Sequence, residues 1–204
     1  MKFPFTKKCE ILVSDALQSD KVIVFPTETF YGIGGNALSK SVVGKIYKIK
    51  RRSTEKSFIL LINLEWLDKI TNSNDSRVND LIEKFWPGPL TLILKANKLI
   101  PEHLKSDNGT VAVRYTSSSV AQKLIELGNC PIIGTSANIS GSSPCYSLKE
   151  VKTQLKNSAD LYVDGGNLDL NQPSTIVNCL SSNFKVLRHG VISISTLNQV
   201  CKVI

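Results

Sequence analysis

The stretch "KVIVFPTETFYGIGGNAL", residues 21–38, joins a short apolar run to a polar segment that is rich in glycine. The apolar run over residues 21–25 predicts a buried strand. Thr27, Glu28 and Thr29 follow it, and three of the next six residues are glycine. Because glycine lets a backbone approach a ligand closely, we interpret the segment as an exit loop against which a small polar ligand binds. A plain tight turn is the alternative.

Helical and strand patterns alternate outward from this stretch. Apolar residues recur at helical spacing over residues 7–18, 42–47, 78–86, 120–125 and 148–156. Further short strands are predicted at residues 58–62, 90–94, 111–115, 131–136, 160–166, 174–179 and 184–188. Because the last strands follow one another without helices between them, we predict one α/β domain over residues 1–204. Its sheet should be twisted and mixed, and flanked by helices.

The composition is that of a soluble, single-domain protein. Of 204 residues, 42% are hydrophobic and 21% are charged, and no apolar run approaches the roughly 20 residues that span a bilayer. Acidic residues at positions 10 and 15 interrupt the N-terminal segment, so we expect no signal peptide, no membrane contact and a cytoplasmic location. Five cysteines without C-x-x-C spacing and two histidines favour reduced thiols over a zinc site or a nucleophilic triad.

Basic residues gather in one segment. The chain carries 25 lysines and arginines against 17 acidic residues, a net charge of +8. Seven of them lie in "KSVVGKIYKIKRRSTEK", residues 40–56, where Glu55 is the single acid. Such a block indicates an anionic ligand: a phosphate ester, a nucleotide or a nucleic acid. The alternative is a solvated helix face.

Two further polar features follow or end predicted strands. The segment "PIIGTSANISG", residues 131–141, places hydroxyl and amide side chains after an apolar run. Such groups at a strand end suit phosphate oxygens or a base edge, although a helix cap and turn would use them too. Arg114 is the single charge in "TVAVRY", and it either pairs with an internal acid or binds a carboxylate.

Residues 32–37 also satisfy G-x-G-x-x-A, a variant of the dinucleotide-binding fingerprint. The acid expected about 20 residues later to bind the ribose is missing, because the candidate Glu55 lies in the basic block. A nicotinamide-dependent oxidoreductase is therefore disfavoured.

Taken in order, these motifs resemble those of the threonylcarbamoyl-AMP synthase family, the YrdC/Sua5 proteins. The resemblance runs from about residue 10 to about residue 190, through "PTETFYGIG", Lys50, Arg52 and Lys56, "FWPGPLTLIL", "TVAVRY", "TSANISG", "STIV" and "LRHG". Ser53 and Asn178 depart from the family pattern, which has proline and often aspartate at these positions. The chain also ends where longer members continue, so we expect the short bacterial type.

The resemblance implies an enzyme with a YrdC-like fold. Its activity would join L-threonine, bicarbonate or CO2, and ATP into threonylcarbamoyl-AMP, with release of diphosphate. ATP would enter with Mg²⁺, and no tightly bound metal or organic cofactor is implied. The product would pass to a transferase complex that modifies the adenosine beside the anticodon of certain tRNAs; direct contact with tRNA or double-stranded RNA is left open.

The resemblance also implies a role for each motif residue. The catalytic cations would be Lys50 and Arg52. The ATP ligands would be Arg52, Lys56, Thr110, Ser136, Asn138 and Arg188. The threonine ligands would be Thr27, Thr29, Arg114, Gly134 and Ser174, with Arg114 on the carboxylate. The competing hypothesis is a module that binds double-stranded RNA or another nucleic acid without turnover, which would not need the set of Lys50, Arg52, Ser136 and Asn138.

Overall fold

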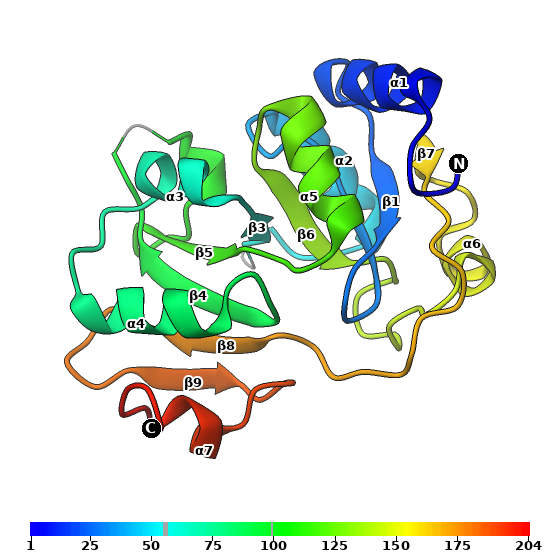
Figure 1. Ribbon diagram of the computed structural model, residues 1–204. Helices are drawn as coiled ribbons and strands as arrows, with labels where there is room; N and C mark the ends of the chain where they lie inside the picture. Colours follow the sequence, from blue (N-terminus) through cyan, green and yellow to red (C-terminus); the bar gives the residue numbers. More distant parts are fainter. Residues whose placement is uncertain (55–56, 99) are drawn as a thin grey trace.

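The strand predicted at residues 21–25 belongs to a mixed sheet of nine strands (Figure 1). The computed structural model describes residues 1–54, 57–98 and 100–204, and across them the strand order is β7-β1-β2-β6-β3-β5-β4-β8-β9. The strands are β1 (Ile23–Pro26), β2 (Tyr31–Gly34), β3 (Ile59–Leu61), β4 (Leu90–Lys95), β5 (Thr110–Arg114), β6 (Ile132–Ser136), β7 (Leu161–Tyr162), β8 (Thr175–Asn178) and β9 (Lys185–Arg188). The pairs β1–β7, β3–β5 and β4–β8 are parallel and the other neighbours are antiparallel, which confirms the predicted mixed sheet.

Helices flank this sheet. They are α1 (Lys7–Gln18), α2 (Lys40–Lys50), α3 (Leu64–Ile70), α4 (Ser76–Phe85), α5 (Ser119–Gly128), α6 (Leu148–Leu155) and α7 (Ile194–Leu197), with one 3-10 turn, η1 (Glu102–Leu104). The five helices predicted from apolar spacing are present, whereas α3 and α7 were not predicted. Within the described ranges, no helix has both the length and the apolar character needed to cross a bilayer.

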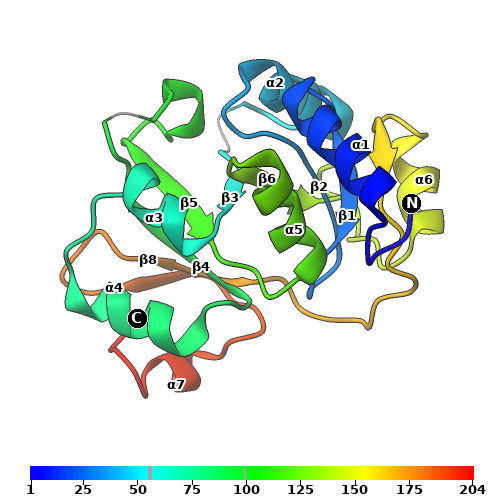
Figure 2. The same cartoon turned by 45° about the horizontal axis from the view of Figure 1, so that its top comes forward.

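Both faces of the sheet are covered at the β1 end. Alternate residues of a strand point to opposite faces. Ile23 and Phe25 belong to an apolar cluster that includes residues of α1 and α5, while Val24 belongs to another that includes the apolar face of α2. Helices α5 and α2 therefore lie on opposite faces of the sheet, as Figures 1 and 2 show.

The polar, glycine-rich segment forms a hairpin instead of the predicted open loop. Strand β2 pairs antiparallel with both β1 and β6. A Cβ at Gly34 would lie 1.9 Å from the backbone oxygen of Ile133, and one at Gly35 would lie 2.7 Å from that of Lys21. These two glycines are therefore required by the close packing of backbone on backbone. The same hairpin rules out the dinucleotide fingerprint, whose glycines belong in a strand-to-helix turn.

The end of α2 determines how the basic block is presented. Ser39 caps the first turn by accepting a hydrogen bond from the amide of Val42 at 3.3 Å. Arg51 ends the helix in a left-handed conformation, with a φ of 50°. At this turn Lys50 points inward and is 2% exposed, whereas Arg51 is exposed. The block is therefore not one solvated helix face.

Candidate functional site

A cavity of about 330 Å³ lies on one face of the sheet and is lined by residues from β2 across to β9. Residues directly opposite each other in neighbouring strands share a face, so their side chains form a common floor. Ile59 lies opposite both Ala112 and Gly134, and Leu61 lies opposite Arg114. A Cβ at Gly134 would lie 2.5 Å from Cγ of Leu61. The lack of a side chain at Gly134 therefore makes room for the side chain of Leu61.

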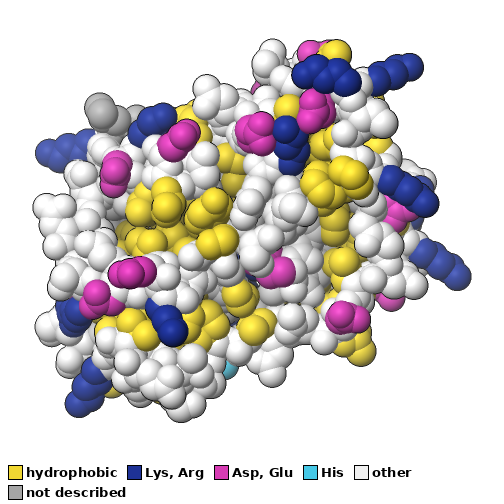
Figure 3. Space-filling model, in the orientation of Figure 1, with side chains coloured by type: hydrophobic (Ala, Val, Ile, Leu, Met, Phe, Trp, Pro, Cys, Tyr) yellow, Lys and Arg dark blue, Asp and Glu magenta, His cyan; other side chains and the backbone are white. Residues whose placement is uncertain are grey.

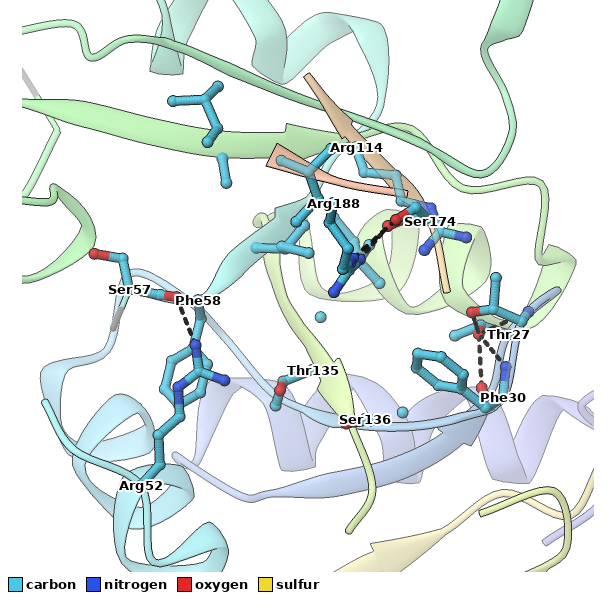
Figure 4. Close-up of a pocket in the computed structure, with 18 of the residues that line it drawn as sticks. Thr27, Phe30, Arg52, Ser57, Phe58, Arg114, Thr135, Ser136, Ser174 and Arg188 are labelled. Atoms are coloured by element: carbon cyan, nitrogen blue, oxygen red, sulfur yellow. Dashed lines mark hydrogen bonds between the residues drawn. The ribbon is translucent and has the colours of Figure 1, made fainter. Parts of the chain in front are cut away.

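Three arginines from separate parts of the chain line this cavity (Figure 4). Arg52 follows α2, Arg114 ends β5 and Arg188 ends β9. Burial lowers the pKa of both Arg52 and Arg188, and the positive charges of Arg114 and Arg52 lower the pKa of Arg188 further. The repulsion indicates concentrated positive charge, which suits an anionic ligand.

Neutral protein groups hold two of these guanidinium groups in place. Arg52 donates from Nη2 to the backbone oxygen of Ser57 at 3.1 Å and lies 5.0 Å from the centre of the Phe58 ring. Arg188 donates from Nε to the backbone oxygen of Ser174 at 3.0 Å and from Nη2 to its hydroxyl at 2.8 Å. Because Ser174 is neutral, its contacts fix the orientation of Arg188 without cancelling its charge.

The turn between β1 and β2 forms another part of the cavity wall (Figure 4). The hydroxyl of Thr27 accepts hydrogen bonds from the amides of Thr29 and Phe30, both at 3.2 Å, and donates to the backbone oxygen of Phe30 at 2.6 Å. The hydroxyls of Thr27 and Thr29 lie 3.0 Å apart. This local network fixes two hydroxyl groups at the cavity, where a small polar ligand can reach them.

Arg114 combines the two alternatives that the sequence left open: it lines the cavity and it pairs with an internal acid. Its Nη2 lies 2.6 Å from Oε1 of Glu28, and its Nε donates to the backbone oxygen of Gly88 at 3.1 Å. Glu28 also accepts from the hydroxyl of Thr116 at 2.5 Å and from the amide of Ser117 at 3.0 Å. Burial alone would raise the pKa of Glu28, but the charge of Arg114 and the bond from Thr116 outweigh it and lower that pKa. Sequence reasoning did not assign Glu28 to the site, although its place between two predicted ligands was an available signal.

A second hollow of about 290 Å³ lies beside the first and shares Arg52 and Ser136 with it. Lys50 and Asn138 line this hollow. The ammonium group of Lys50 donates to the backbone oxygens of Ser136 and Asn138, the latter at 2.8 Å. The side-chain amide of Asn138 donates to the backbone oxygen of Ser142 at 2.5 Å. Lys50 and Asn138 therefore shape the turn that follows β6 and line the second hollow.

Lys50 is expected to make the protein more stable as the pH rises above 8. Burial, followed by the charge of Arg52, lowers its pKa from 10.5 to about 8, against a smaller opposing effect of Cys145. Between pH 8 and pH 10.5 the unfolded chain still binds a proton that the folded protein has released, so the free energy of unfolding increases with pH. We expect this increase in the free energy of unfolding to be about 3 kcal/mol larger in wild type than in Lys50→Met, whose side chain does not titrate. Urea denaturation of both proteins at about pH 7 and about pH 10.5 measures this difference; an equal change in both would contradict the prediction.

The predicted site residues within the described ranges line the two hollows, and Arg52 and Ser136 line both. Those lining the larger cavity are Thr27, Thr29, Arg52, Thr110, Arg114, Gly134, Ser136, Ser174 and Arg188. Lys50 and Asn138 line the smaller one, and Lys56 lies outside the described residues. The structure adds lining residues for which the motifs assigned no role, namely Phe30, Ser57, Phe58, Ser106 and Thr135.

Comparison with known proteins relates this chain to one family. A family model described as Sua5_yciO_yrdC, telomere recombination, matches residues 15–190. The threonylcarbamoyl-AMP synthase of Pyrococcus abyssi is 33% identical over 185 residues, which are 90% of this chain and 54% of that protein. The threonylcarbamoyl-AMP synthase of Wigglesworthia glossinidia brevipalpis is 33% identical over 181 residues, 87% of this chain and 92% of that protein. The chain thus spans about half the length of the first relative and most of the second.

Solved structures are similar over most of the chain. The structure of P. abyssi Sua5 complexed with L-threonine has a TM-score of 0.92 at 29% identity, over 100% of this chain and 61% of that one. The structure of E. coli YciO has a TM-score of 0.81 at 27% identity, over 92% of this chain and 93% of that one. The α/β fold with its mixed sheet is the fold of these proteins.

Proposed function

Because the chain belongs to the Sua5/YciO/YrdC family, we propose that it makes threonylcarbamoyl-AMP and diphosphate from L-threonine, bicarbonate or CO2, and ATP. The observation that carries the proposal is that chemically different groups line two ends of the larger cavity. Figure 4 shows Arg52 at one end and Thr27 of the β1–β2 turn at the other, with Arg114 and Arg188 close to Ser174. Arg52 and Arg188 suit the phosphates of a nucleotide, while Arg114 and the hydroxyls of the β1–β2 turn suit a small amino acid. The similarity to a structure complexed with L-threonine supports the assignment of the second end.

In the proposed reaction, the amine of threonine adds to CO2, loses a proton and becomes a carbamate. A carbamate oxygen then attacks the α-phosphorus of ATP, the bond from that phosphorus to the bridging oxygen breaks, and diphosphate leaves. Both reactants are anions, so their repulsion adds to the barrier. Arg52 and Arg188 reduce this repulsion and stabilise the charge that develops on the phosphoryl oxygens and the leaving group. The carbamate is already anionic, so its attack needs no general base.

We assign the predicted ligands to this reaction by the hollow that each one lines. In the larger cavity, the amino acid is assigned to Thr27, Thr29, Arg114, Gly134 and Ser174, and the nucleotide to Arg52, Thr110, Ser136 and Arg188. Lys50 and Asn138, in the second hollow, are assigned to the phosphates, and Lys56 stays a predicted ATP ligand. Mg²⁺ would arrive with ATP and be bound by phosphate oxygens and water, which suit a hard cation. We infer that the product serves the tRNA modification next to the anticodon in the cytoplasm, through a separate transferase complex.

A module that binds RNA without turnover is not favoured. Duplex RNA is bound largely through its phosphates, which requires a basic stripe or patch. On the face drawn in Figure 3, Lys and Arg side chains are scattered among acidic ones and form no continuous patch. The relatives described above are named as synthases.

The protein is expected to release diphosphate from ATP only when both threonine and bicarbonate are present. The amino acid and CO2 supply the nucleophile, and without them the α-phosphorus has no partner in the cavity. A coupled diphosphate assay with each component omitted in turn measures this dependence. Release that does not change when threonine is omitted would refute the proposal, and tight binding of duplex RNA without turnover would favour the alternative.

A further inference from the structure

Glu28 forms a neutral ion pair with Arg114 at the amino-acid end of the cavity. Arg114 lines the cavity and Glu28 does not, so the carboxylate lies behind the arginine. The two side chains are 6% and 19% exposed, which limits screening by water and salt. Bonds from Thr116 and Ser117 keep the carboxylate in place. The pair therefore offers directed hydrogen-bond donors with little net positive charge.

Arg188, which lies beside Arg114, has the opposite character. Arg188 bonds two oxygens of Ser174, both neutral, so its charge is not compensated by these partners. Burial lowers its pKa, and the charges of Arg114 and Arg52 lower it further. The larger cavity thus combines an uncompensated charge at Arg188 with a compensated charge at Arg114, and the two side chains lie close together (Figure 4).

Two substrates of different charge must share this space. The triphosphate of ATP carries up to four negative charges, whereas an amino acid enters as a zwitterion with no net charge. A fully charged Arg114 would attract the triphosphate as strongly as Arg188 does, and phosphates there would block the amino acid. Specificity for one of two ligands is often obtained by weakening the attraction for the other.

We propose that Glu28 is a specificity-determining residue, which neutralises Arg114 and so keeps polyphosphate away from the amino-acid end of the cavity. The inference rests on the proposed function, in which ATP and threonine occupy the two ends. Glu28 touches neither substrate in this account and acts through Arg114. Its removal should therefore change which anion binds at Arg114, beyond any effect on folding.

Inorganic tripolyphosphate is a suitable probe because it carries the charge of ATP without the nucleoside. In the wild-type protein it should compete with ATP and not with threonine. In Glu28→Gln it should also compete with threonine. Its inhibition constant against threonine should be at least about tenfold lower in this variant than in wild type. The matched control is Glu126→Gln, which makes the same charge change on an exposed side chain of α5. It should behave as wild type.

Two results would overturn the inference: unchanged tripolyphosphate inhibition in Glu28→Gln, or an equal increase in Glu126→Gln. If Glu28→Gln does not fold, Arg114→Gln can be compared with Glu28→Gln/Arg114→Gln. The single variant leaves a bare carboxylate, so it should bind tripolyphosphate about tenfold more weakly than the double variant; equal affinities would also overturn the inference. Calorimetric titration with tripolyphosphate needs no turnover, so it tests Glu28 even if wild type releases no diphosphate and the proposed function fails.

Discussion

Arg52→Ala is expected to lower kcat for threonine-dependent diphosphate release by about 100-fold or more. Arg52 lines both hollows, where phosphates and the leaving diphosphate are assigned. Its charge acts on a transition state in which negative charge grows, so the loss should exceed any effect on ground-state binding. Steady-state kinetics with ATP and threonine both saturating isolates this effect, and thermal melting of the same variant should change far less.

The matched control for Arg52 is Lys48, an exposed residue near the end of α2. Lys48→Ala removes one positive charge from the same basic block, so it tests whether general attraction of anions explains the loss. We expect kcat within about twofold of wild type, because exposed charges are screened by water and salt. Arg51 is a poorer control, since it borders the smaller hollow. Equal losses at positions 48 and 52 would contradict a specific role for Arg52.

The local elements of the fold were predictable because their signals are local. Helix α5 was predicted from the spacing of Val120, Ala121, Leu124 and Ile125, all of which are buried. Strand β2 was missed because its glycines resemble those of a loop. Gly34 is required because a side chain there would collide with the backbone oxygen of Ile133, about 100 residues away in the chain. Such a contact leaves no trace in the neighbouring sequence.

The residue types of the site were easier to predict from the sequence than the contacts between its residues. The basic block predicted an anion site, and its Arg52 lines the larger cavity. The left-handed turn at Arg51 decides that Lys50 is buried, which residue spacing does not reveal. Arg188 and Ser174 meet because β8 pairs with β9, and Glu28 reaches Arg114 across 86 positions of sequence. These contacts depend on the order of strands in the sheet, which the sequence patterns did not specify.

Arg114→Ala is expected to weaken threonine binding by about 3 kcal/mol, roughly 100-fold. The lost interaction is a charge-assisted pair between a guanidinium fork and the amino-acid carboxylate. ATP binding measured without threonine should change little, because Arg52 and Arg188 remain. Arg114→Lys should recover only part of the loss, since an ammonium group lacks the planar fork. Calorimetric titration of each variant with each substrate provides the comparison.

The ion pair with Glu28 adds a second effect that must be separated from binding. Removing one partner of a buried pair leaves an uncompensated charge and typically costs about 3–5 kcal/mol of stability. Arg114→Ala should therefore also lower Tm, and the bare carboxylate of Glu28 should repel the carboxylate of threonine. Glu28→Gln/Arg114→Gln removes both charges, so it should recover much of the Tm. It should not recover threonine binding, because the fork is still absent. A double variant that regains stability and also binds threonine as wild type does would show that Arg114 serves the fold and not the substrate.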